Sequence, residues 1–356
     1  MALARARGTG ARGLTMKLRT VLGLLLGVAV LTGTLAYAGV AAVTRTFEGL
    51  GLWGLLALAL AHVPVEAFLG LAWRLACGGA GASPRRFLWA RFVRVAAAET
   101  LPFSQIGGFV LGVRALRLQG SAALRGVLSM CVDLVVELMA KLPYVFAATC
   151  LLLALSPRSD LARPLGLGLL VTAFAVAAAL LAGRRMGGAL AGLARRIAGR
   201  WPVLASLDRL HGEGDASATL TALLARRREL RLAFGLHLLC WFAGAAELWL
   251  AFWLLGRPVT AGEALVIDGA VAGLRTFVFM VPAAAGVQEA SYVLAASVFG
   301  IPPAAAVAAS FARRARDLTL GAGTLAVAAA TDPGLRRLGV RARRAARRGE
   351  SGAPGS

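Results

Sequence analysis

Residues 275–317 read RTFVFMVPAAAGVQEASYVLAASVFGIPPAAAVAASFARRARD. The stretch is apolar enough for a lipid bilayer, but Pro282 and Gly286 interrupt it, and Gln288 and Glu289 follow directly. Interrupted backbone at membrane depth is tolerated only where protein buries it or a water-filled cavity faces it. Ionisable groups at that depth are costly and usually functional. We therefore interpret this stretch as one half of a functional site, with the other half supplied earlier in the chain.

The composition is that of a membrane protein. Of the 356 residues 58% are hydrophobic, and several segments reach the roughly 20 apolar residues that cross about 30 Å of hydrocarbon as a helix. We predict an all-α, polytopic integral membrane protein. The formal charge of +22 does not indicate nucleic acid as a partner, because the arginines gather in a few loops and at both ends, as membrane topology requires. Anionic lipid headgroups are the expected partners of these basic segments.

Apolar length and charge predict six full spans with both termini in the cytoplasm. The spans cover about 18–40, 50–73, 121–156, 164–183, 231–255 and 303–331. Around them we expect a basic cytosolic leader (1–19), a transmembrane domain (20–331) and a basic, disordered cytosolic tail (332–356). Ala36-Tyr37-Ala38 also matches a signal-peptidase site, although the topology works with the first span retained.

Two basic segments connect the spans on the cytosolic side. The segment 74–94 carries five arginines and reads as a loop. The segment 184–230 places leucines and an isoleucine three and four residues apart, with arginines between them. That pattern is typical of an amphipathic helix lying on the anionic inner surface.

Two further apolar segments are broken near their centres. Residues 94–120 contain LPFSQIGG at 101–108, and residues 262–300 contain VPAAAGVQEA at 281–290. Each has a proline followed by a glycine, with Gln or Glu nearby, and such pairs of interrupted segments point to a transport site. We interpret them as re-entrant segments of opposite orientation, which form an inverted repeat. The alternative makes both segments full spans, giving eight.

Charged residues inside the spans follow helical spacing. Asp133, Glu137 and Lys141 recur every four residues, so they share one face. His62 and Glu66 have the same spacing. These groups either tie helices together or line a polar cavity, and in both cases they should avoid lipid. No ligand spacing indicates a metal or another cofactor.

These residues make the chain similar to the lysylphosphatidylglycerol synthase transmembrane-region family, whose members are flippase-like membrane proteins. The resemblance rests on LPFSQIGGFVLGVRAL (101–116), on EALVIDGAVAGLRTFVFMVPAAAGVQEASYVLAASVFGIP (263–302) and on ARRARDLTLGAGTL (312–325). Within the family the chain looks most similar to the membrane protein encoded with hopanoid-biosynthesis enzymes. The resemblance implies a lipid-handling protein of the inner (plasma) membrane. The family motif often has proline-glycine where this chain has Pro282-Ala283.

The expected function is translocation of a lipid, anionic or isoprenoid, along a polar groove between the broken segments. Lysyl transfer is not expected, because only a 25-residue tail follows residue 331, and the chain shows no catalytic signature. The alternatives are a membrane scaffold for lipid-biosynthesis enzymes, docked through 184–230, and, less favoured, an intramembrane lipid-modifying enzyme. The candidate substrate-binding residues are Glu99, Gln105, Gly107, Asp133, Glu137, Arg275, Gly286, Gln288, Glu289, Arg313 and Arg316. A local alternative makes Arg275 and Glu289 a structural ion pair.

Overall fold

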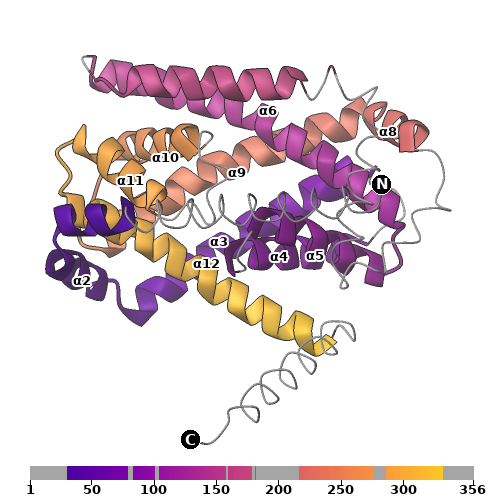
Figure 1. Ribbon diagram of the computed structural model, residues 1–356, viewed down its shortest axis with the longest axis horizontal. Helices are drawn as coiled ribbons and strands as arrows, with labels where there is room; N and C mark the ends of the chain where they lie inside the picture. The colour runs from indigo at the N-terminus through magenta and orange to yellow at the C-terminus, as the bar shows by residue number, and fades with distance from the viewer. Residues whose placement is uncertain are drawn as a thin grey trace, which may run out of the picture. The chain divides into compact units, whose positions relative to one another are not determined.

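The computed structural model describes residues 30–78, 83–100, 104–157, 159–178, 181, 216–275 and 286–331 (Figure 1). Within these ranges the protein is all-helical and contains no strand. The expected leader and tail, and most of the expected surface helix at 184–230, lie outside the described residues. The part of that segment that is described forms α8 (Ala216–Leu224) and the beginning of the next helix.

Four long helices provide the framework: α3 (Gly51–Ala76), α6 (Ala123–Leu155), α9 (Arg227–Leu254) and α12 (Pro303–Thr331). Three of them are long and apolar enough to cross a membrane, over Gly51–Ala76, Leu124–Leu155 and Arg227–Leu254. These confirm the helices predicted at 50–73, 121–156 and 231–255. The helix α12 has the predicted bounds, but its arginine cluster lowers its apolarity.

The remaining predicted spans are less regular. The span expected at 164–183 corresponds to a shorter apolar helix, Ala162–Ala178. Of the span expected at 18–40, residues 30–38 are described and helical. The next helix, α2 (Val40–Glu48), was not predicted; it begins after Gly39, which has a φ of 80°.

Short helices occupy both broken segments. In the first, α4 (Pro84–Thr100) packs against α5 (Ser104–Leu118), and in the second, α10 (Ala261–Arg275) packs against α11 (Val287–Ser297). At 1.5 Å per residue each of them is about 16–26 Å long, shorter than the hydrocarbon layer. The predicted breaks, with Pro102 and Pro282, fall at 101–103 and 276–285, which lie outside the described residues.

The predicted loop 74–94 is wrong over its second half. The helix α4 begins at Pro84, and proline suits the first position of a helix because its missing N–H would have no partner there. Arg91 lies inside this helix, buried, and Arg94 is 11% exposed. Carboxylates on other helices neutralise both arginines, so a charge density typical of a loop is compatible with a packed helix.

The chain divides into two compact units, whose boundaries fall within α3, α6, α9 and α12. The first unit comprises 1–65, 138–177 and 238–316, and the second comprises 66–137, 178–237 and 317–356. The core of the first unit contains Leu58, Leu152, Leu165, Leu248 and Phe252. The core of the second contains Trp73, Phe87, Leu116, Leu128 and Met130.

Paired glycines allow close helix packing in each unit. In the second unit, a Cβ at Gly108 of α5 would lie 2.5 Å from the Arg94 carbonyl oxygen of α4. In the first unit, a Cβ at Gly269 of α10 would lie 2.3 Å from the Ala148 Cβ of α6. Both glycines have a second glycine four residues later, at Gly112 and Gly273. This spacing brings helix backbones together inside membranes.

Large apolar side chains on the outside of the helices fit a surface that contacts lipid. Trp53 is 82% exposed and Phe174 77% exposed. A soluble protein rarely exposes many such side chains together. The exposed set also includes Phe146, Leu170 and Trp253, which agrees with a membrane protein.

Candidate functional site: two buried ion-pair clusters

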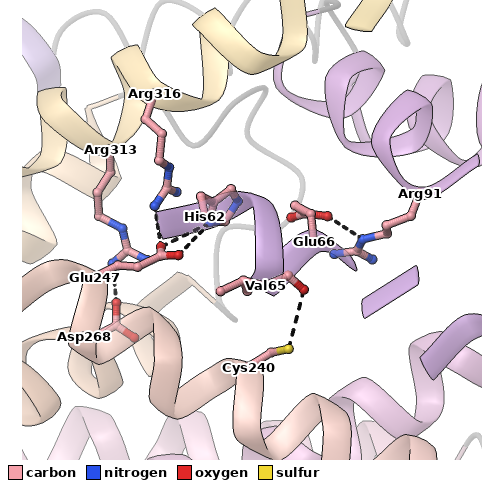
Figure 2. A network of polar contacts seen from close by, with 9 residues as sticks. All are labelled: His62, Val65, Glu66, Arg91, Cys240, Glu247, Asp268, Arg313 and Arg316. Carbon is pink, nitrogen blue, oxygen red and sulfur yellow. Dashed lines mark hydrogen bonds and ion pairs between the residues drawn. The ribbon is translucent and has the colours of Figure 1, made fainter. Parts of the chain in front are cut away.

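The first-unit cluster is organised around three arginines of α12. Arg313 donates to Asp268 of α10, Arg314 Nη2 donates to Glu289 Oε1 of α11 at 2.9 Å, and Arg316 donates to Glu247 of α9. Figure 2 shows Arg313 and Arg316 reaching from α12 toward these partners. Each arginine therefore holds a different helix, and the three guanidiniums balance three carboxylates.

Further donors complete the first-unit cluster. His62 Nδ1 of α3 lies 3.0 and 3.1 Å from the two Glu247 oxygens, so the ring donates to a carboxylate that Arg316 also binds (Figure 2). Tyr144 Oη donates to Asp268 Oδ2 at 2.6 Å. Both carboxylates are nearly inaccessible, with 5% of Glu247 and 6% of Asp268 exposed. Buried charges persist only when they are paired and hydrogen-bonded, and these carboxylates meet that condition.

Glu289 is a structural residue of α11. Its Oε2 accepts a hydrogen bond from the Gly286 N–H at 2.7 Å, which is the glutamate half of a capping box. Gly286 precedes the helix with a φ of 78°, a conformation that favours glycine. The other Glu289 oxygen binds Arg314, and Gln288 Nε2 donates to Ser310 Oγ at 3.1 Å. The interrupted segment is thereby fixed to α12.

The structure brings together most of the residues predicted in the second motif, with one exception. Gly286, Gln288, Glu289 and Arg313 all lie within the first unit's bonded network. Arg275 is exposed at the end of α10, whereas Glu289 pairs with Arg314. The alternative of an Arg275–Glu289 ion pair is therefore wrong: Arg275 is exposed at the end of α10, and Arg314 of α12 binds the Glu289 carboxylate.

The second-unit cluster is organised around two arginines of α4. Arg91 Nε donates to Glu66 Oε2 of α3 at 2.8 Å, as Figure 2 shows. Arg94 Nη1 donates to Asp133 Oδ2 of α6 at 3.4 Å, and its Nη2 lies 3.8 Å from Glu137 Oε2. His237 Nε2 of α9 lies 2.9 Å from Asp133 Oδ1. Here too one carboxylate is shared between an arginine and a histidine.

The second-unit cluster is incompletely satisfied. Arg91 Nη1, Glu137 Oε2 and His237 Nδ1 are buried and have no hydrogen-bond partner among the described residues. One further such atom in the described part of the chain is Arg117 Nη1 on α5. Native proteins leave few buried polar atoms unpaired, so three in one cluster require an explanation.

The remaining predicted residues have mixed outcomes. Asp133 and Glu137 belong to the second-unit cluster, and Asp133 is fully buried. Glu99 is half-buried near the end of α4, and Gly107 is half-buried in α5. The Gln105 side chain lies outside the described residues. His62 and Glu66 share a face of α3, as predicted, but each binds a different helix.

Sequence reasoning missed Arg91, Arg94 and His237 as site residues. The two arginines were assigned to topology, because five arginines between 74 and 94 resemble a cytosolic loop. Their spacing of three residues was the available signal, since it places both on one helix face. His237 lies within the predicted span 231–255, and a histidine inside an apolar span is itself a candidate.

The described residues contain no group of three or more His, Cys, Asp and Glu side chains placed to hold a metal ion. The four cysteines Cys77, Cys131, Cys150 and Cys240 are free thiols. Burial raises the pKa of the Cys77 thiol just beyond α3, which keeps it protonated and unreactive. Cys240 instead donates to the Val65 carbonyl at 3.6 Å (Figure 2).

Comparison with known proteins identifies one relationship. A family model described as the lysylphosphatidylglycerol synthase TM region matches residues 21–323. No curated protein and no solved structure matches the chain. The matched region contains every residue of both clusters.

Proposed function

Because the chain belongs to the lysylphosphatidylglycerol synthase transmembrane-region family, we propose that it moves a lipid between the leaflets of the inner membrane. The headgroup would bind at the second-unit cluster while the hydrocarbon tail stays in the bilayer. The family and the apolar helices make this a membrane protein with a lipid-related function. Translocation is the more specific step that we add.

One observation carries the proposal. The second-unit cluster combines buried, paired charges with three buried polar atoms that make no hydrogen bond to a described residue. A cluster that served only to join helices would gain stability by pairing every atom, as the first-unit cluster does for its carboxylates. Unused atoms beside paired charges are what a site for a polar ligand requires.

Hydrogen bonds between a headgroup and the cluster would lower the crossing barrier enough for transport. A headgroup that enters hydrocarbon unpaired loses several kcal/mol for each polar group. A hydrogen bond to a charged group returns about 1.5–3 kcal/mol, and each 1.4 kcal/mol removed from a barrier speeds crossing about tenfold. Contacts with the three unused atoms would therefore accelerate crossing by several orders of magnitude.

For the membrane arrangement we propose six full spans, two re-entrant helix pairs and cytoplasmic termini. The pairs are α4–α5 and α10–α11, whose helices are each too short to cross. Single cysteines introduced at Ser83 and Gln119 into a cysteine-free variant test the first pair. Both should react with a membrane-impermeant thiol reagent from the cytoplasmic side, whereas labelling from opposite sides would indicate full spans and support the eight-span arrangement.

The decisive experiment is translocation of fluorescent lipids in proteoliposomes, read as loss of inner-leaflet fluorescence to an external quencher. The panel contains phosphatidylglycerol, phosphatidylcholine, a glycosyl diacylglycerol and a hopanoid, which the resemblance to hopanoid-associated relatives suggests. We expect at least one lipid to cross tenfold faster than in protein-free vesicles, and His237→Gln to reduce that rate about tenfold. Glu229→Gln, at an exposed ion pair of α9, is the matched control and should transport normally.

The scaffold and enzyme alternatives become outcomes of the same experiment. If no lipid crosses faster than in empty vesicles, translocation is wrong and capture of lipid-biosynthesis enzymes through 184–230 becomes the next test. If a lipid is chemically altered during the assay, the protein is an enzyme. We propose no catalytic role for any residue of the two clusters.

A further inference from the structure

We propose that the second-unit cluster recognises a neutral, hydroxyl-bearing headgroup, such as a sugar or another polyol, in preference to a phosphate. This inference rests on the proposed function, because the ligand would be the headgroup of the transported lipid. It goes further by naming the chemistry that the site selects. The argument comes from charge, from the unused atoms and from burial.

The charge of the cluster disfavours an anion. Three carboxylates, from Glu66, Asp133 and Glu137, face the two guanidiniums of Arg91 and Arg94. Counted over these five side chains, with His237 neutral, the charge sums to −1, so a phosphodiester would bring a further negative charge to a buried site.

The unused atoms call for a group that both donates and accepts. Arg91 Nη1 is a donor and needs an oxygen. Glu137 Oε2 is an acceptor; it lies 3.8 Å from Arg94 Nη2, within an ion pair but too far for a hydrogen bond, so it can still accept one from a ligand. His237 Nε2 donates to the Asp133 carboxylate, which leaves Nδ1 as an acceptor when the ring is neutral and as a donor when it is protonated. A hydroxyl satisfies each of these atoms in either state of the ring, whereas phosphate oxygens only accept.

Because the cluster is buried, a ligand cannot reach it by binding loosely at the protein surface. Arg91 is 6% exposed and His237 1% exposed, so a ligand reaching their unused atoms must be largely enclosed. Glu137 is the most accessible member, with 26% of its side chain exposed. It therefore marks the side from which a headgroup enters.

Binding is measured by native mass spectrometry of the purified full chain in detergent, titrated with glucosyl diacylglycerol or with phosphatidic acid carrying the same acyl chains. We expect wild type to bind the glucosyl lipid about tenfold more tightly. Glu137→Gln should weaken that binding about tenfold, because a charge-assisted hydrogen bond becomes a neutral one. It should also strengthen binding of phosphatidic acid, because one negative charge is removed.

A readout of folding separates recognition from structure. Glu137→Gln removes one negative charge and brings the sum over the five side chains from −1 to zero, so its thermal unfolding temperature without lipid should equal or exceed that of wild type. His237→Gln provides the second variant, and Glu229→Gln the control with unchanged binding. If Glu137→Gln loses folding and binding together, Glu137 is structural and the assignment fails.

Two results would overturn the inference. The first is that wild type binds phosphatidic acid as tightly as the glucosyl lipid. The second is that both variants bind lipid like wild type, because water alone satisfies the unused atoms. The translocation assay tests the proposed function separately. If the protein binds the glucosyl lipid but moves no lipid, the proposed transport function is wrong and the headgroup site stands. If it moves lipids without preferring any headgroup, the headgroup site is wrong and the transport function stands.

Discussion

The two ion-pair clusters share a design but differ in completeness. In each unit, arginines of one helix bind carboxylates of neighbouring helices, and one carboxylate also binds a histidine: Glu247 with His62, and Asp133 with His237. In the first unit three arginines meet three carboxylates. In the second, two arginines meet three carboxylates, and three buried atoms have no partner among the described residues.

This difference distinguishes a cluster that holds helices together from a cluster that can bind a ligand. A saturated network stabilises one arrangement of helices, because each removed partner leaves a buried charge alone. An unsaturated network keeps capacity for a ligand at some cost in stability. We therefore propose that the first unit serves architecture and the second recognition, although the chain's most recognisable motif, around Gly286 and Glu289, lies in the first.

The largest effect should come from breaking the saturated cluster. Glu247→Gln leaves Arg316, 3% exposed, without its carboxylate, and should lower the free energy of unfolding by about 3–5 kcal/mol. Equilibrium unfolding of the purified protein in detergent measures this loss. Glu229→Gln should change stability by less than about 1 kcal/mol, because its ion pair is exposed.

A double variant sharpens that prediction. Arg316→Met combined with Glu247→Gln removes both buried charges and should recover most of the lost stability. A double variant as unstable as Glu247→Gln alone would mean that the loss does not come from breaking the Arg316–Glu247 ion pair.

An intermediate effect should come from the helix contacts that position each cluster. Gly269→Ala and Gly108→Ala place a Cβ within 2.3 and 2.5 Å of atoms on a neighbouring helix, and each should cost about 1–3 kcal/mol. Gly323→Ala on α12 meets nothing within 4 Å and should be neutral or stabilising. Equal stabilities for all three variants would show that these helices do not approach so closely.

A smaller effect is expected from the matching substitution in the unsaturated cluster. Asp133→Asn weakens the bonds to Arg94 and His237, but Arg94 keeps Glu137 nearby and the excess negative charge disappears. We expect a loss of about 1–2 kcal/mol, clearly below that of Glu247→Gln, in the same unfolding experiment. A loss as large as that of Glu247→Gln would remove the distinction between the clusters.

The sequence predicts the positions of the helices better than the ion-pair partners of their charged residues. Apolar length determines a membrane helix, so α3, α6, α9 and α12 were predicted closely, whereas the predicted interruptions at Pro102 and Pro282 lie outside the described residues. The pairing of charges was predicted poorly. Arg91 and Arg94 resembled loop arginines, because only tertiary contacts with Glu66 and Asp133 reveal that their charges are compensated.

The site illustrates the same limit. Glu289 was expected to contact substrate because an acidic residue follows a broken segment, yet its oxygens cap α11 and bind Arg314. His237 was overlooked although it lies inside the apolar span 231–255, where an ionisable residue is itself a candidate. Its significance comes from burial beside Asp133 and from one unused ring nitrogen, neither of which spacing can show.

The most direct test of this account compares lipid translocation by one conservative variant from each cluster. Arg314→Lys keeps the charge that faces Glu289 in the first unit, and His237→Gln removes the unused ring nitrogen in the second. In proteoliposomes containing equal amounts of folded protein, we predict that Arg314→Lys moves lipid within about twofold of wild type and that His237→Gln is slowed about tenfold. The reverse order would place the transport site in the first unit and contradict the account.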